Sequence, residues 1–239
     1  MKSRFDLLPR DMLFKLALEL SLPDLLNFCS NDRVNELVCS QKDIWLAKLK
    51  QDFGMNYQML KSDPRENYEL LYGLTELKRK WNLKQDIYTL YNLKELFLHN
   101  NNQIKDIPKE IGNLTNLQLL NLSNNDIKDI PKEIGNLTDL QELDLSNNKI
   151  EEIPKEIGNL TNLLELNLNY NQIKEIPKEI GNLTNLLELY LMNNQIKEIP
   201  KEIGDLTNLQ KLYLNDNQIK EIPKEIGNLT NLQLSLIHI

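Results

Sequence analysis

Residues that could serve as nucleophiles or metal ligands are few, since the 239-residue chain holds two cysteines and two histidines. Cys29 and Cys39 have no histidine nearby and lack the paired spacing of a zinc site, so we expect both to be reduced and buried among apolar side chains. His99 has no nucleophile or second metal ligand beside it, which favours a surface position. The sequence therefore predicts a protein that is not an enzyme and that holds no metal or cofactor.

The composition excludes several other classes of protein. The chain contains 49 Leu and 32 Asn, about a third of all residues, which rules out low-complexity disorder. Residues 81–239 carry 15 basic and 23 acidic residues, a net charge of −8, which argues against a nucleic-acid partner. No apolar stretch is long enough to span a membrane, and the first residues lack the apolar core of a signal peptide. We expect a monomer in the cytoplasm or nucleus, not a secreted protein.

A repeat accounts for the excess of leucine and asparagine. Six prolines from Pro108 to Pro223 lie 23 residues apart, and six glycines from Gly112 to Gly227 keep the same period. In the unit that starts at Leu117, Leu120 and Leu122 alternate as in a strand with one buried face. In the same unit, we expect Asn125 to belong to a ladder of asparagines that bond buried backbone groups. Pro131 is expected at the first position of a short helical turn, and Gly135 at the end of that turn.

This unit resembles the leucine-rich repeat in its 23-residue intracellular type, over residues 83–233 in six units. The resemblance implies an α/β solenoid with a curved parallel sheet, whose concave face binds a protein substrate. Outward strand positions differ between units, are acidic in the middle and carry aromatic or Met residues toward the ends, which are types enriched at interfaces. The predicted substrate-binding residues are Glu95, Phe97, His99, Glu142, Asp144, Glu165, Asn167, Tyr170, Glu188, Tyr190, Met192, Lys211 and Tyr213.

Two places depart from the repeat. The first unit has one extra residue within Asn100–Asn102, so its turn is expected to bulge. After Gln233 the pattern requires apolar residues at 235 and 237, whereas the chain has Ser235 and Ile237. We interpret residues 234–239 as a non-native tail that ends a longer array, the alternative being a natural short tail.

Residues 5–54 follow a helical pattern that differs from the repeats. Pro9 can begin a helix whose residues Met12, Leu13 and Leu16 share a face, and Ser21 to Asp24 form a break followed by a cap. Two further helical segments contain Val38 and Trp45, and residues 55–82 are predicted to be a helical linker and cap for the solenoid. Such a small all-α module has a marginal core of its own.

The module resembles the F-box in Leu8-Pro9, in Leu20 followed by Asp24-Leu25-Leu26, in Val38-Cys39 and in the closing Trp45 and Leu49. F-box proteins with leucine-rich repeats are substrate receptors of Skp–cullin–F-box ubiquitin ligases, so the resemblance implies a Skp-type adaptor as one partner and an unknown protein substrate as the other. Trp45 is expected to close the module's own core. Adaptor contacts, or residues that support them, would be Leu8, Pro9, Met12, Leu13, Leu16, Leu25 and Leu26.

Two further points concern the source of the protein and an alternative function. Cys39, Trp45, Lys48-Leu49 and Asp52-Phe53 are similar to F-box-like proteins of giant DNA viruses, and the scarcity of Arg and Ala agrees with an AT-rich coding sequence. The alternative is a non-catalytic intracellular leucine-rich scaffold, similar to the Ras-pathway group, without a ubiquitin role.

Overall fold

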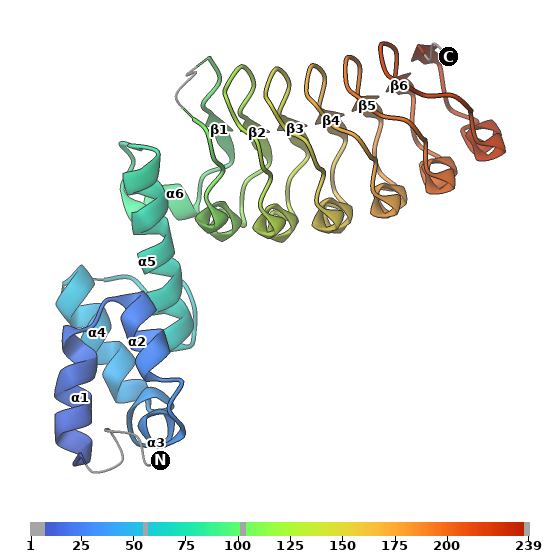
Figure 1. Ribbon diagram of the computed structural model, residues 1–239. Helices are drawn as coiled ribbons and strands as arrows, with labels where there is room; N and C mark the ends of the chain where they lie inside the picture. The colour runs from blue at the N-terminus through green and yellow to red at the C-terminus, as the bar shows by residue number, and fades with distance from the viewer. Residues whose placement is uncertain (1–7, 55–56, 101–103, 237–239) are drawn as a thin grey trace. The chain divides into compact units, whose positions relative to one another are not determined.

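The computed structural model describes residues 8–54, 57–100 and 104–236 (Figure 1). The chain forms two compact units, Met1–Glu76 and Leu77–Ile239. The division falls inside helix α5 (Pro64–Lys80), and thus within the segment predicted as a linker. Among the described residues, no helix is both long and apolar enough to cross a membrane.

The N-terminal unit is helical, as the sequence predicts. Ser21 and Asn31 accept hydrogen bonds from the backbone N–H groups of Asp24 and Val34, and so cap the second and third helices. Besides the first part of α5, the elements are α1 (Arg10–Glu19), α2 (Leu22–Phe28), α3 (Asp32–Val34), the π-helix η1 (Asn35–Cys39) and α4 (Lys42–Phe53).

Trp45 lies in the core of this unit, which confirms its predicted place. Its indole Nε1 donates a hydrogen bond of 2.7 Å to the Cys39 carbonyl, and its ring lies 5.9 Å from that of buried Tyr68. Lys48 is only 3 % exposed, and its ammonium donates to the carbonyls of Leu18 and Leu20 at the end of α1. The same ammonium pairs with Asp52 at 3.0 Å, so the buried charge is fully compensated.

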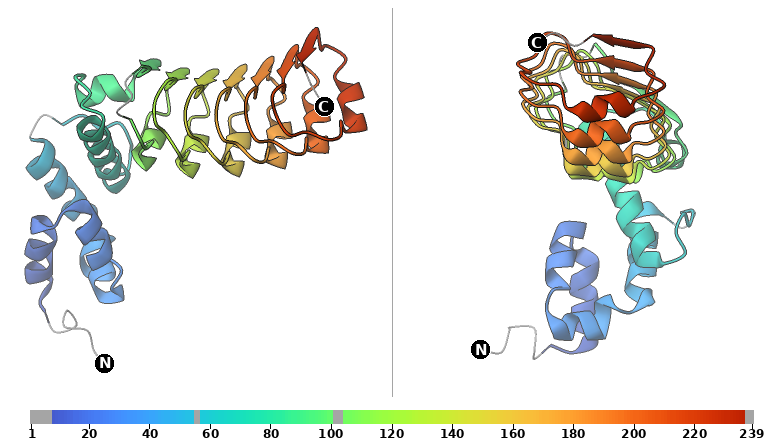
Figure 2. Two further views of the ribbon diagram at one scale, coloured as in Figure 1. Left: turned by 45° about the horizontal axis from the view of Figure 1, so that its top comes forward. Right: turned by 90° about the vertical axis from the view of Figure 1, so that its right-hand side faces the viewer.

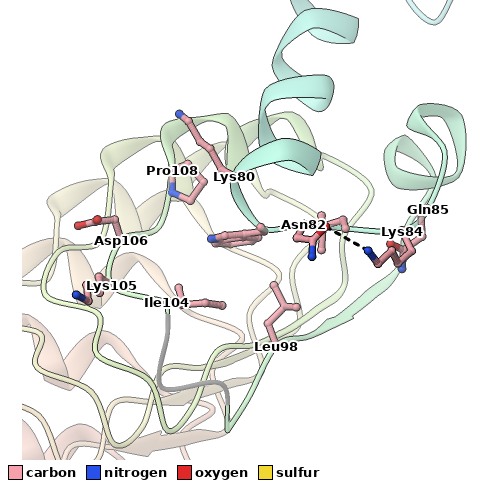
Figure 3. A pocket seen from close by; sticks show the side chains of 11 residues that line it. Lys80, Asn82, Lys84, Gln85, Leu98, Ile104, Lys105, Asp106 and Pro108 are labelled. Atoms are coloured by element: carbon pink, nitrogen blue, oxygen red, sulfur yellow. Dashed lines mark hydrogen bonds between the residues drawn. The ribbon is translucent and has the colours of Figure 1, made fainter.

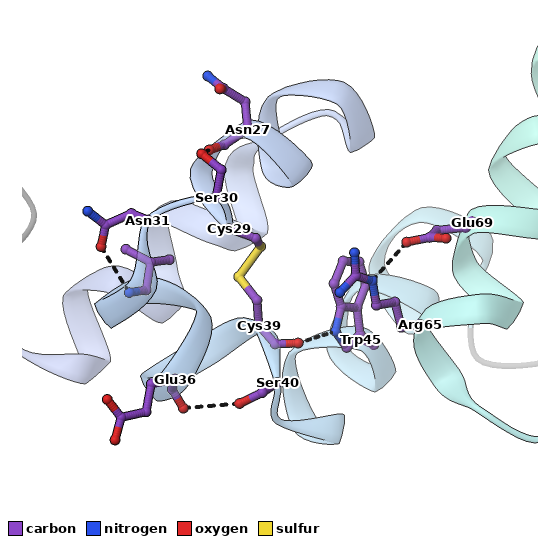
Figure 4. The surroundings of a disulfide bond; sticks show 11 residues. Asn27, Cys29, Ser30, Asn31, Glu36, Cys39, Ser40, Trp45, Arg65 and Glu69 are labelled. Carbon is purple, nitrogen blue, oxygen red and sulfur yellow. Dashed lines mark hydrogen bonds and ion pairs between the residues drawn. A yellow bond between two sulfur atoms is a disulfide. The ribbon is translucent and has the colours of Figure 1, made fainter.

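Cys29 and Cys39 form a disulfide, so the expectation that they are reduced thiols is wrong (Figure 4). Between them the chain reverses through α3 and η1, which brings their Cα atoms to 5.8 Å. That distance is within the range that a disulfide requires. A spacing of ten residues in the sequence does not reveal this reversal, because it depends on how the short helices turn.

The C-terminal unit is a solenoid with one parallel sheet, in the order β1 to β7, as the sequence predicts. Helix α6 (Ile87–Tyr91) precedes the repeats. The strands are β1 (Glu95–Phe97), β2 (Leu119–Asn121), β3 (Glu142–Asp144), β4 (Glu165–Asn167), β5 (Glu188–Tyr190), β6 (Lys211–Tyr213) and β7 (Leu234–Leu236). Figure 2 shows them stacked along one side of the unit, with six 3-10 helices along the other: η2 (Lys109–Asn113), η3 (Lys132–Asn136), η4 (Lys155–Asn159), η5 (Lys178–Asn182), η6 (Lys201–Asp205) and η7 (Lys224–Asn228).

The seventh strand exceeds the six predicted from the repeat. It comes from the tail, where Leu234 pairs with Lys211 and Ser235 takes the register position of buried Leu212. Leu234 and Leu236 are exposed. Whether the tail is native stays a prediction, and both Ile237 and the predicted bulge at residues 101–102 lie outside the described residues.

The predicted asparagine ladder is confirmed. The Asn171 amide donates to the carbonyls of Leu145 at 3.0 Å and of Leu168 and Asn169 at 3.2 Å, and it accepts from the Ile150 N–H at 3.0 Å. Asn148, Asn194 and Asn217 repeat this arrangement. Each rung therefore satisfies backbone groups of two repeats that are otherwise buried without partners.

Proline and glycine lie where predicted, but their roles differ from the prediction. Pro131 is the extended residue that precedes η3, one position before the expected one. Gly135 lies within η3 and does not end it; a Cβ there would stand 2.6 Å from the Glu156 carbonyl oxygen of the next repeat. The glycine is thus needed because neighbouring turns stack closely, and not because the backbone requires a left-handed residue.

A second ladder, which the sequence analysis missed, runs along the segment before each strand. The side-chain amides of Asn162, Asn185, Asn208 and Asn231 each donate to a threonine carbonyl of the preceding repeat, at 2.8–2.9 Å. Asn116 donates in the same way to Tyr91. The repeat that starts at Leu117 has Asp139 at this position, and a carboxylate cannot donate such a bond.

Replacing Asp139 with Asn is expected to raise the free energy of unfolding by about 0.5–1 kcal/mol, because it adds the missing hydrogen bond. Urea denaturation followed by circular dichroism measures the change. Asp129→Asn removes the same charge at an exposed loop position and should leave the midpoint unaltered. Equal gains in both variants would attribute the effect to charge rather than to the ladder.

Candidate functional site

The variable residues of the repeats share the exposed face of the parallel sheet. Register places them in two rows across the strands, and we call this surface the exposed sheet face. The first row is Glu95, Leu119, Glu142, Glu165, Glu188 and Lys211; the second is Phe97, Asn121, Asp144, Asn167, Tyr190 and Tyr213. The sheet thus brings together side chains that lie 23 residues apart in the sequence.

Three adjacent glutamates form the acidic centre of this face. Glu165 stands between Glu142 and Glu188, and burial together with these carboxylates raises its pKa above the ordinary value. Burial also acts on Glu188, but hydrogen bonds from Lys211 and Tyr190 outweigh it and lower the pKa of Glu188. Within the described residues, Glu188 therefore has side-chain partners, whereas its neighbours Glu165 and Glu142 have none.

An aromatic pair lies beside the acidic centre. The rings of Tyr190 and Tyr213 stack with centroids 5.0 Å apart and planes within 14°. The Tyr190 hydroxyl donates to one carboxylate oxygen of Glu188, and the Lys211 ammonium binds the other oxygen at 2.7 Å. Burial and the nearby Glu188 carboxylate raise the pKa of Tyr190, so its hydroxyl stays protonated.

The other end of the face holds Phe97 and His99, whose rings meet edge to face at 6.2 Å. Of the remaining predicted residues, Met192 donates its backbone N–H to Asn169 Oδ1 at 2.7 Å. Tyr170 occupies a turn position with φ +55°, which Asn takes in the equivalent turns at Asn124, Asn147 and Asn193. A tyrosine in this left-handed conformation is uncommon, and its exposed ring lies beside the face.

The predicted adaptor residues of the N-terminal unit divide into two sets. Met12, Leu16 and Leu26 are 51 %, 42 % and 37 % exposed, although all three are large apolar side chains. Pro9 is also exposed, and Leu8 is half-buried. Leu13 and Leu25 are fully buried, so they support the helices from within and cannot contact another protein directly.

A cavity of about 970 Å³ in the C-terminal unit was not found by sequence reasoning (Figure 3). Leu98 and Ile104 from the first repeat line it, together with residues 80–85 that precede α6. Lys80 binds Glu110 at 2.7 Å and Lys84 binds Asn82 at 3.2 Å, so these cations already have partners. Among the described residues there is also no group of three or more His, Cys, Asp or Glu arranged to hold a metal.

A solenoid whose shared residues fill the interior and whose variable residues face outward is the architecture of a protein-binding repeat protein. A family model described as leucine-rich repeat region matches residues 71–166 and 120–195, and a second, described as leucine rich repeat, matches residues 208–229. The first model covers more than half of the sequence, and the chain belongs to the leucine-rich repeat family. This fold is typically a non-enzymatic interaction scaffold.

Solved structures agree with this assignment. A leucine-rich repeat protein from Leptospira interrogans is 40 % identical over 64 % of this chain and 45 % of its own, with a TM-score of 0.54. The ectodomain of the Arabidopsis thaliana receptor kinase GASSHO1/SCHENGEN3, in complex with CASPARIAN STRIP INTEGRITY FACTOR 2, is 38 % identical over 60 % of this chain, with a TM-score of 0.57. The plant peptide hormone receptor RGFR1, in complex with RGF2, is also 38 % identical over 60 %, with a TM-score of 0.55.

The chain spans less than half the length of these solved proteins: 45 %, 18 % and 24 % in the same order. No protein of curated function matches it.

Proposed function

We propose that the chain is the substrate-recognition subunit of a Skp–cullin–F-box ubiquitin ligase. The exposed sheet face would hold a protein substrate, and the N-terminal unit would bind a Skp-type adaptor. The chain would contribute to ubiquitin transfer by proximity. One module binds the ligase and the other binds the substrate, so the transfer step becomes effectively intramolecular. Action in the cytoplasm or nucleus, as a monomer, is part of the proposal, as is an origin in a giant DNA virus.

One observation carries the protein-binding half of this proposal. The leucines and isoleucines shared by the repeats are buried, whereas the strand residues that differ between repeats gather on the exposed sheet face. Two of the structural relatives are receptors solved in complex with a ligand, one of them named as a peptide hormone receptor. These relatives support a protein or peptide ligand for the repeats of this chain.

The adaptor-binding half is supported by apolar side chains that the N-terminal unit leaves exposed. Met12 and Leu16 lie one turn apart on α1, and Leu26 lies on α2. Apolar side chains that lie together on an exposed surface are typical of surfaces that bind a partner. We propose residues 5–54 as the adaptor-binding module.

Co-purification of the full chain with a Skp-type adaptor tests the ubiquitin role. Leu16→Asp is expected to weaken adaptor binding about tenfold or more, as for a contact residue at the centre of an interface. Leu46→Asp, a similarly exposed leucine on α4 that is not among the predicted contacts, should retain binding. Absence of binding by the unaltered chain, or equal loss in both variants, would reject the adaptor role.

The alternative is a non-catalytic intracellular leucine-rich scaffold without a ubiquitin role, in which the N-terminal helices are only a cap for the repeats. The Cys29–Cys39 disulfide favours neither function, because both are intracellular and the cytosol keeps most cysteines reduced. Adaptor binding measured with and without a reducing agent therefore tests the ligase role, because a ligase subunit of the cytosol must bind its adaptor when both cysteines are thiols.

A further inference from the structure

The exposed sheet face has a chemistry that indicates what kind of protein segment it binds. We infer that it recognises an arginine side chain of its partner, with the guanidinium stacked on the Tyr190–Tyr213 pair and bonded to the carboxylates of Glu142 and Glu165. This inference deepens the proposed function and rests on its protein-binding half.

The aromatic part of the site is ordered before any ligand arrives. The two tyrosine rings are nearly parallel, and Glu188 holds both the Tyr190 hydroxyl and the Lys211 ammonium. Both rings are partly exposed. A guanidinium is planar and weakly hydrated, so it stacks well on such a ring.

The adjoining carboxylates supply charge complementarity. Within the described part of the chain, Glu142 and Glu165 form no ion pair and no hydrogen bond through their side chains, because the one nearby cation, Lys211, is bound to Glu188. Register places Glu165 directly beside Glu188, and Asn167 beside Tyr190. Glu165 is thus diagonal to Tyr190 on the neighbouring strand, at a separation that a long side chain spans.

The environment of Glu165 agrees with a missing cation. Burial and the carboxylates of Glu188, Glu142 and Asp144 raise its pKa, whereas Lys211 lowers it more weakly.

Arginine fits this arrangement better than lysine. Its fork of N–H donors can bond two carboxylates while the plane rests on an aromatic ring, whereas an ammonium is a point charge that keeps its water. The remaining groups that face this position from neighbouring strands are Asp144 and Asn167, which add negative charge and amide acceptors.

Fluorescence anisotropy with fluorescein-labelled hexa-arginine and hexa-lysine peptides tests the inference on the full chain. Hexa-arginine should bind about fivefold or more tightly than hexa-lysine, and Glu165→Gln should weaken hexa-arginine binding about fivefold. Tyr190→Ala should remove most of the preference for arginine, and Tyr190→Phe should keep it, because the ring remains.

Glu175→Gln is the matched control, since it removes the same charge from an exposed loop position away from the strands. Equal loss of binding in Glu175→Gln and Glu165→Gln, or equal affinity for both peptides, would overturn the inference and attribute binding to the net charge of the chain. The assay contains no adaptor, and adaptor binding uses neither peptide. Failure here with intact adaptor binding therefore rejects arginine recognition alone, and the reverse result rejects the ubiquitin role alone.

Discussion

Replacing Gly158 with alanine is expected to lower the free energy of unfolding by about 3 kcal/mol, at the upper end of overpacking penalties. The added Cβ would stand 2.6 Å from the Glu179 carbonyl oxygen and 2.9 Å from the Glu179 Cβ. Backbone atoms cannot move aside as a flexible side chain can, so the stacking of η4 on η5 must open. Urea denaturation monitored by circular dichroism measures the loss.

Gly227→Ala provides the matched control, because the same segment of the last repeat has open space around the glycine. There the substitution should be neutral or should stabilise by up to about 1 kcal/mol, by restricting the unfolded chain. A similar loss at both positions would mean that the repeat needs glycine for its backbone conformation rather than for the approach of its neighbour.

Asn171→Ala is expected to destabilise the protein by about 3 kcal/mol, since it leaves several buried backbone groups without partners. Its amide bonds three carbonyls and one N–H of two adjacent repeats. Chemical denaturation gives the change, and hydrogen exchange at Ile150 should accelerate.

Asn228→Ala is the corresponding control, because Asn228 is exposed and its side chain forms no hydrogen bond within the described residues. A change within about 0.5 kcal/mol is expected there. If both substitutions cost the same, the ladder would contribute nothing beyond the general preference for asparagine in turns.

Most of the solenoid was predictable because its constraints are local and repeated. Alternating leucines predict the strands, and asparagine at a fixed distance beyond them predicts the first ladder; both are confirmed. The assignment of variable positions to one face follows from the period of a strand alone. For that reason the exposed sheet face could be identified residue by residue.

Features that depend on distances between segments were not predictable. Gly135 is required because two neighbouring turns stack closely, and that distance is not visible in the sequence. The second ladder depends on a backbone carbonyl of threonine as acceptor, which has no sequence signal. The disulfide requires a chain reversal between Cys29 and Cys39 that spacing alone conceals. Leu13 and Leu25 are buried whereas Met12 and Leu16 are exposed, and this difference likewise depends on how α1 and α2 are oriented in the unit.

Both ladders point in one direction along the chain, which bears on how the gene can change in length. Each asparagine bonds its own repeat and the one before it, as Asn148 does with Leu122 and Asn162 with Thr138. Loss of repeats from the C-terminal end therefore leaves a backbone N–H without its acceptor, as Ile196 would be without Asn217, whereas loss from the N-terminal end leaves an unpaired asparagine acceptor, as already at Asn125 Oδ1 among the described residues. In-frame duplication or deletion of a whole internal repeat keeps every rung paired, because each asparagine meets the same carbonyls and the same N–H group in its new neighbour.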